Sequence, residues 1–376
     1  MLYKLKSGIG QYWYSTPSML TYLLSPFSAL YCLIISLRKK YLSKKKVDFN
    51  VPVIVVGNIT VGGTGKTPFV IWLSEFLKNK GYQPGIVSRG YGGKSKTYPL
   101  TVRPDSDPHQ AGDEAVLLAM RTQCPVVIDP DRVNAARYLL DNHHCNIIIS
   151  DDGLQHYRLR RDIEVVIIDG ERQMGNGFCL PAGPLREPVT RLDTVDFIVI
   201  NNAINSNNIS NNKALKLENF EHRKYNMTLI PGKIYNLSSP ELEAAPDYFL
   251  GEPIHAVAGI GNPERFFSQL RSFGLSIWPH SFTDHHRFSQ KELDFSIETK
   301  IIMTEKDAVK CRDFSDYRFW CMPVTAEIDP QLGEDILEKI HKAAQGGLAP
   351  MARNPHRSAA FQADLDKSEK TILSPI

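Results

Sequence analysis

Residues 60–67 read TVGGTGKT and lie between an apolar run at 53–56 and an amphipathic stretch. A glycine-rich turn between a strand and a helix can surround phosphates with backbone N–H donors, and the helix N-terminus adds a partial positive charge. Lys66 is expected to reach the β- and γ-phosphates of a nucleotide, and the Thr67 hydroxyl to bind magnesium. The general pattern has glycine where this chain has Thr60, and an ordinary tight turn is the alternative. The predicted nucleotide-binding residues are Thr60, Val61, Gly62, Gly63, Thr64, Gly65, Lys66 and Thr67.

Two carboxylates follow a second apolar run. Residues 147–152 read IIISDD, which places Asp151 and Asp152 at the carboxyl end of a predicted strand, as in a Walker B element. A strand of this kind beside a phosphate loop delivers a carboxylate to the magnesium ion. Gln155 and His156 follow in a turn that would bring the imidazole near the same place. A solvated turn rich in Asp and Gly is the alternative interpretation.

Position alone leaves the role of several other charged residues open. Asp113 begins an apolar helix, where an acid at the helix N-terminus is favoured; a base at the mouth of a sheet is the alternative. Arg132 follows a predicted strand. It is either a site residue or simply a residue at the start of a helix with no functional role. The proline-stiffened loop 181–188 presents Arg186 and Glu187, and a guanidinium on a rigid loop suits phosphate recognition.

Two adjacent histidines stand in the second half of the chain. His285 and His286 follow Asp284, and residues 304–310 read TEKDAVK. Neighbouring side chains point in opposite directions, so at most one of the two histidines is expected to line a given site. Lone histidines are more often structural, and nothing local decides between the two.

The elements that must position these residues alternate between apolar runs and helical stretches, which predicts a parallel sheet covered by helices and a second, smaller α/β lobe. A cleft between lobes is a favoured ligand site. The predicted strands are 126–128, 147–149, 165–168 and 197–200 in the first lobe and 255–258, 276–278, 301–303 and 319–324 in the second. The predicted units are a membrane-associated segment (1–46), a phosphate-loop domain (47–212), a linker (213–250), the second lobe (251–345) and a disordered tail (346–376).

The N-terminal segment predicts membrane association. Residues 19–37 carry no charge, and six Lys or Arg residues follow within 38–46. At about 1.5 Å per residue the apolar stretch could just cross a bilayer core of ~30 Å, or it could lie in the interface with the basic cluster on anionic headgroups. Either arrangement puts the basic end of the segment, and so the catalytic body, in the cytoplasm. A buried core helix is the alternative.

Composition and charge argue against a nucleic-acid-binding protein and against a zinc protein. The chain has 376 residues, 42% of them hydrophobic, and a formal charge of only +3. Its basic run contains no interleaved aromatic residue except Tyr41, which argues against a nucleic-acid partner. The six cysteines form no close pairs, which favours reduced thiols and indicates no zinc site.

Seven motifs together resemble the tetraacyldisaccharide 4'-kinase (lipid A 4'-kinase) family. They are TVGGTGKTP from 60, SRGYGG from 88, GDE from 112, DDGLQH from 151, GPLRE from 183, TDHHRF from 283 and TEKDAVK from 304. The likeness runs from the apolar segment to about residue 340, and Thr60 is itself similar to the family's loop. It implies a membrane-associated P-loop kinase that phosphorylates the 4'-hydroxyl of a tetraacylated glucosamine disaccharide 1-phosphate with ATP and Mg²⁺ to give lipid IVA.

The resemblance also implies a role for each matched residue. Asp113 would be the catalytic base, assisted by His285, which reverses the preference that position alone gave. Lys66 and Arg186 would be further catalytic residues, and Thr67, Asp151 and Asp152 would hold magnesium. Residues Arg132, Gln155, His156 and Glu187 would bind substrate. The implied partners are the lipid disaccharide, ATP and the membrane surface, with no obligate protein partner evident; a membrane-tethered nucleotide switch or transport-type ATPase is the competing hypothesis.

Overall fold

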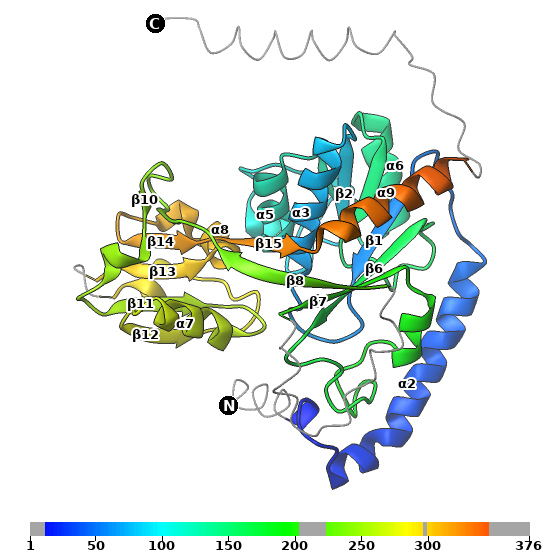
Figure 1. The fold of residues 1–376 in the computed structure, drawn as a ribbon, viewed down its shortest axis with the longest axis horizontal. Coiled ribbons are helices and arrows are strands. Elements are labelled where there is room, and N and C mark those ends of the chain that lie inside the picture. Colours follow the sequence, from blue (N-terminus) through cyan, green and yellow to red (C-terminus); the bar gives the residue numbers. More distant parts are fainter. Residues whose placement is uncertain (1–11, 203–222, 296–298, 346–376) are drawn as a thin grey trace, which may run out of the picture.

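Two mixed sheets form the two lobes of the molecule (Figure 1). The structure is a computed structural model, and it describes residues 12–202, 223–295 and 299–345. The large sheet contains β1 (Val53–Gly57), β2 (Pro84–Ser88), β3 (Leu100–Val102), β4 (Val126–Ile128), β5 (Ile147–Ser150), β6 (Ile163–Asp169), β7 (Phe197–Asn201), β8 (Lys224–Pro231) and β15 (Val324–Ile328). The small sheet contains β9 (Ile234–Asn236), β10 (Glu243–Ala244), β11 (Ile254–Ala258), β12 (Ile277–Ser281), β13 (Ile301–Thr304) and β14 (Phe319–Met322).

Parallel pairing in the centre of the large sheet brings the phosphate loop and the paired carboxylates to one edge. The strand order is β15-β8-β7-β6-β1-β5-β2-β4-β3, and β1 pairs in parallel with both β5 and β6. Ile54 lies opposite Ile149 on one side and Ile163 on the other. Every residue of these three strands is buried, as expected where helices cover both faces of a parallel sheet.

Helices cover both faces of each sheet. On one face of the large sheet lie α3 (Lys66–Asn79), α5 (Asp113–Thr122) and α9 (Pro330–Gln345); α6 (Arg132–Asn142) and η1 (Val189–Thr194) cover the other. In the small lobe, α7 (Pro263–Ser272) and α8 (Glu305–Cys311) take opposite faces. The remaining short helices are α4 (Pro108–Ala111), η4 (Pro246–Phe249), η5 (Gln290–Leu293) and η6 (Arg312–Phe314). The predicted α/β class is therefore confirmed.

The lobes are joined by two adjacent strands. β8, which lies within the range expected as a linker, and β15 pair antiparallel and belong to the large sheet. The single strand expected at 319–324 is two strands, β14 and β15, separated at Pro323, which has no N–H to donate to a ladder. The β8 strand alternates buried and exposed positions and so lacks the continuous apolar run that marked the central strands. The segments 203–222 and 346–376 lie outside the described residues.

The helix α2 (Met19–Ser43) runs along the outside of the large lobe (Figure 1). It is long and apolar enough to cross a membrane, and only Thr21 and Ser28 on it are buried. The Ser28 hydroxyl donates to the Cys179 carbonyl at 2.9 Å, and the Tyr31 hydroxyl to the Arg186 carbonyl at 3.3 Å. The helix therefore contacts the body along one side, where Tyr31 and Cys32 also pack against the large-lobe core, and it exposes most of its apolar side chains, unlike the buried core helix considered as the alternative.

Candidate active site

The phosphate loop links β1 to the first turn of α3. Gly65 precedes the helix with a φ of +96°, and a Cβ there would meet the amide nitrogen of Asn201 at 2.5 Å. Thr60, by contrast, forms an antiparallel bridge with Leu185, and the next N–H, of Val61, donates to the Pro184 carbonyl at 2.8 Å. The first position of the loop is thus paired backbone, where a side chain is accommodated. This pairing also fixes loop 181–188 beside the phosphate loop.

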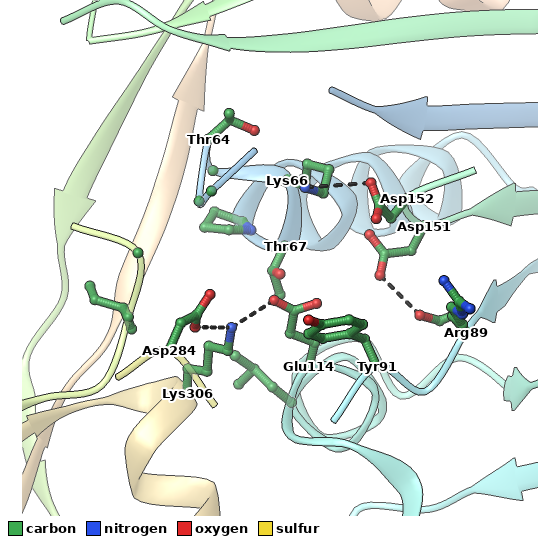
Figure 2. A pocket seen from close by; sticks show the side chains of 18 of the residues that line it. Thr64, Lys66, Thr67, Arg89, Tyr91, Glu114, Asp151, Asp152, Asp284 and Lys306 are labelled. Carbon is green, nitrogen blue, oxygen red and sulfur yellow. Dashed lines mark hydrogen bonds and ion pairs between the residues drawn. The ribbon is translucent and has the colours of Figure 1, made fainter. Parts of the chain in front are cut away.

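Asp151 and Asp152 stand at the carboxyl end of β5, facing the same cavity as Lys66 (Figure 2). Asp151 accepts a hydrogen bond from the Ser88 hydroxyl at 3.1 Å. Asp152 lies 3.6 Å from the Lys66 ammonium and accepts from the Arg186 guanidinium at 3.1 Å. The two carboxyls therefore have different electrostatic surroundings although they are neighbours in sequence.

These surroundings shift the two acids in opposite directions. Burial, reinforced by the negative charges of Glu114 and Asp152, raises the pKa of Asp151 to about 6. Burial acts in the same direction on Asp152, but the charges of Lys66 and Arg186 outweigh it and lower the pKa of that carboxyl to about 2. A buried carboxyl held near other negative charges gains most from a bound cation.

The donor set fits magnesium better than zinc. Among the described residues, no group of three or more His, Cys, Asp or Glu side chains is arranged to hold a metal ion. Magnesium instead uses one or two carboxylates with water and substrate phosphates. Thr67, Asp151 and Asp152, which all line the cavity, match that pattern.

Asp113 and His285 meet across the boundary between the lobes. The Nδ1 atom of His285 lies 2.9 Å from Asp113 Oδ1, and the Tyr91 ring packs edge-on against the imidazole at 4.8 Å. Burial acts to raise the pKa of Asp113, but the hydrogen bond to His285 and the charge of Lys306 lower it below its ordinary value. The adjacent histidine, His286, contacts Glu292 instead, at 3.1 Å. Only one of the two histidines faces the site, as expected.

Asp113 also occupies the first turn of α5, as its position in the sequence favoured. Its Oδ1 accepts from the backbone N–H of Glu114 at 2.8 Å, so the carboxylate satisfies one free donor of the helix N-terminus. The two interpretations of this residue are compatible. Oδ1 accepts from the N–H at the start of the helix, and both carboxylate oxygens lie within hydrogen-bonding distance of Nδ1 of His285. Only 4% of Asp113 is exposed, and its neighbour Glu114 lines the cavity.

One cavity of about 1120 Å³ collects most of the predicted site residues. The phosphate loop, the ends of β2 and β5, loop 181–188, the second lobe and the C-terminal end of α2 all contribute to its wall. The predicted residues that line it are Val61, Gly62, Gly63, Thr64, Gly65, Lys66, Thr67, Arg132, Asp151, Asp152, Gln155, His156, Arg186 and His285.

Two of the residues expected to bind substrate, Arg132 and His156, are largely buried. Arg132 donates to the Asp129 carbonyl at 2.8 Å, and burial lowers its pKa to about 10. Burial, with the nearby charges of Arg132 and Arg89, lowers the pKa of His156 to about 3, so this imidazole is neutral at pH 7. Both residues still face the cavity, and they offer it one cation and one neutral ring.

Glu187 does not line the cavity. It is 2% exposed, and its carboxylate accepts hydrogen bonds from Gln155 at 2.6 Å and from the Tyr157 hydroxyl at 2.7 Å, with Arg191 at 3.3 Å. Glu187 therefore holds Gln155, which does face the cavity, in place. The resemblance implied that Glu187 itself would bind substrate, but in the structure it lies behind the cavity wall. The residue type alone does not predict that a glutamate is buried in this way.

Sequence reasoning gave no role to several residues that also line the cavity. Lys306 bridges Glu114 and Asp284, and Arg38 reaches the cavity from α2. The TEKDAVK motif marks Lys306, but its partner Glu114 is 192 positions away in the chain. A pairing across that separation leaves no local pattern, so only the folded structure shows it.

Comparisons with known proteins agree on one family. The family model described as tetraacyldisaccharide-1-P 4'-kinase matches residues 20–341. A tetraacyldisaccharide 4'-kinase from Nitrosococcus oceani is 46% identical over 346 residues, covering 91% of this chain and 97% of the relative; one from Methylobacillus flagellatus is 48% identical over 322 residues, covering 85% and 91%. The crystal structure of an "apo" form of LpxK from Aquifex aeolicus in complex with ATP is similar with a TM-score of 0.69 at 28% identity, covering 86% of this chain and all of that one.

Proposed function

The chain belongs to the tetraacyldisaccharide-1-P 4'-kinase family, and we propose that it transfers the γ-phosphate of ATP to the 4'-hydroxyl of a tetraacylated glucosamine disaccharide 1-phosphate. The product is lipid IVA, and the reaction is a step of lipid A biosynthesis. The observation that carries the proposal is a single cavity bounded by a phosphate loop on one lobe and by His285, in contact with Asp113, on the other. A nucleotide switch would not require this second side.

Phosphoryl transfer depends mainly on positioning and on neutralising charge. Lys66 and the loop N–H groups hold the phosphates, Arg186 stabilises charge that develops on the transferred group, and Asp113 orients the acceptor hydroxyl and takes its proton. Thr67, Asp151 and Asp152 would hold Mg²⁺, which supplies further positive charge on the phosphates when bound. Because the base and its histidine come from different lobes, the catalytic arrangement depends on how the lobes close.

The acceptor side of the cavity suits a phosphorylated sugar. Arg132, Gln155 and His156 offer one cation and two neutral polar groups, and Arg38 adds a second cation from α2. Since α2 also exposes apolar side chains, a lipid held in the membrane can present its headgroup to the cavity without being extracted. We place the protein at the inner membrane with its catalytic body on the cytoplasmic face, because the basic run follows the apolar segment.

Incubation of the purified protein with γ-labelled ATP, Mg²⁺ and the disaccharide 1-phosphate acceptor is expected to move label into the organic phase. The acceptor lacking its 4'-hydroxyl serves as the control and should remain unlabelled. Label that appears only as free phosphate, with or without acceptor, would contradict the kinase assignment and favour the nucleotide-switch alternative.

The exposed face of α2 gives a second prediction. Leu30 and Ile34 lie one helical turn apart and are 54% and 55% exposed. Burying each in lipid contributes about 1.5 kcal/mol, so changing both to Asp is expected to weaken binding to anionic vesicles at least 100-fold. Sedimentation with vesicles measures this. Changing Leu242 and Leu250, which are similarly exposed in the second lobe, to Asp is the matched control, and equal loss in both variants would mean that α2 is not the anchor.

A further inference from the structure

Lys306 lies in the first turn of α8 and reaches across the boundary between the lobes (Figure 2). Its ammonium donates to Glu114 at 2.8 Å and to Asp284 at 2.9 Å, and it stands 3.3 Å from Nε2 of His285. Burial acts to lower the pKa of Lys306, but the carboxylates of Glu114, Asp113 and Asp284 outweigh it and raise that pKa above its ordinary value. Lys306 is therefore a cation throughout the pH range of an enzyme assay.

The hydrogen-bonding chemistry of an ammonium decides which histidine nitrogen carries the proton. Lysine has three N–H donors and no acceptor. Two donors serve the carboxylates, and the third faces Nε2 of His285, which must then be the accepting nitrogen of the ring. The ring proton consequently lies on Nδ1, from which it is donated to Asp113 Oδ1 at 2.9 Å.

We propose that Lys306 is a positioning residue that holds His285 in the neutral Nδ1–H tautomer and so directs a neutral donor at Asp113. A neutral donor orients the carboxylate while leaving it more able to accept a proton than an imidazolium would, since an adjacent cation favours the charged form of the acid. Lys306 acts through His285 and contacts no reacting atom. The link to rate rests on the proposed kinase function, whereas the tautomer does not.

The surroundings of His285 show what the loss of Lys306 would do. The titratable groups that face the imidazole are Asp113 from α5, Lys306 from α8, Asp284 from its own loop and Tyr91 from the loop after β2, with Lys310 behind Asp113 and Glu114 behind Lys306. Asp284 Oδ2 is 3.6 Å from Nε2. Without the ammonium, this carboxylate is the nearest partner for Nε2, and it favours a second proton on the ring.

The direction of the pH effect follows from these charges. Burial acts to lower the pKa of His285, its hydrogen bond to Asp113 raises it above the ordinary value, and Lys306 opposes that rise. Removing Lys306 therefore raises the pKa further, and His285 becomes neutral only at higher pH. A unit charge at this separation typically changes a pKa by about 1–3 units.

The first test is the pH profile of kcat for Lys306→Met against wild type. We expect the acid limb to move to higher pH by about one unit, which is a loss of about tenfold on that limb. Lys306→Arg, which keeps the cation, should retain the wild-type limb. Adding Asp284→Asn to Lys306→Met removes the anion that favours the imidazolium and should move the limb back. Lys306→Gln provides the same comparison if the Met variant does not fold.

The second test observes the ring directly in protein labelled with ¹⁵N-histidine, with His285→Gln used to assign the signals. Wild type is expected to show a protonated Nδ1 and a bare Nε2 at pH 8, and Lys306→Met to show both nitrogens protonated at pH 7. A proton on Nε2 in wild type, or a Lys306→Met variant whose rate falls equally at every pH, would overturn the proposal. The expected tautomer in a protein that phosphorylates no acceptor would uphold it and overturn the kinase function instead.

Discussion

Asp113→Asn is expected to lower kcat by about 100- to 10,000-fold, because loss of a positioned general base removes a contribution of that size. Asparagine has nearly the same shape, and its carbonyl oxygen can still accept from the Glu114 N–H, so the start of α5 should be preserved. ATP binding should stay close to that of wild type, because the polar contacts of Asp113 are with Glu114, His285 and Lys310 rather than with the phosphate loop. Single-turnover transfer to the lipid acceptor measures the first effect, and calorimetric titration with ATP the second.

A matched control is available at the neighbouring histidine, His286, which also contacts a carboxylate. Glu292 contacts His286 much as Asp113 contacts His285, but on the side away from the cavity. Glu292→Gln should therefore leave both transfer and ATP binding unchanged. Normal turnover in Asp113→Asn would remove that residue as the base, whatever the control shows.

Lys66→Met is expected to weaken both ATP binding and transfer, in contrast to Asp113→Asn. The ammonium is the charged donor of the phosphate loop, and loss of one preorganised donor typically costs about 100- to 1000-fold in rate. It also lies 3.6 Å from Asp152, so its removal should raise the low pKa of that carboxyl and leave Arg186 as the nearest cation. The Kd for ATP should therefore rise, and kcat should fall.

Lys78→Met tests whether the effect of Lys66→Met is local. Lys78 stands in the last turn of the same helix and donates to the Thr122 carbonyl at 3.0 Å, away from the cavity. The Lys78→Met variant should bind ATP as wild type does. If Lys66→Met retained the wild-type Kd and kcat, the loop at 60–67 would not be the nucleotide site.

The strands β1, β4, β5, β6 and β7 and the phosphate loop could be predicted because their signals are local, whereas the buried strand β2, which begins with Pro84 and Gly85, was missed. Continuous apolar runs mark buried parallel strands, and glycine at positive φ marks the turn, as at Gly65. The β8 strand was missed and β15 was merged with β14, because β8 and β15 each present one face to solvent and their burial patterns alternate. The fold class was therefore recoverable from sequence, whereas the way in which the lobes are joined was not.

The candidate site divides in the same manner. Asp151 and Asp152 follow a buried strand, and that context indicated their place beside Lys66. The contact between Asp113 and His285 joins residues 172 positions apart, and it became expected only through the resemblance to a family. Residue patterns carry no record of such pairings, because they depend on how two lobes meet.

The pairing of β8 with β15 also shows how the second lobe is placed in the chain. Pro231 at the end of β8 lies opposite Val324 at the start of β15, and the Gly232 N–H donates to the Pro323 carbonyl at 2.8 Å. The chain thus leaves the large sheet and returns to it at one point, as a hairpin does. The whole second lobe is an insertion in that hairpin, so the part that supplies His285 can be exchanged between proteins without rerouting the sheet that binds the nucleotide.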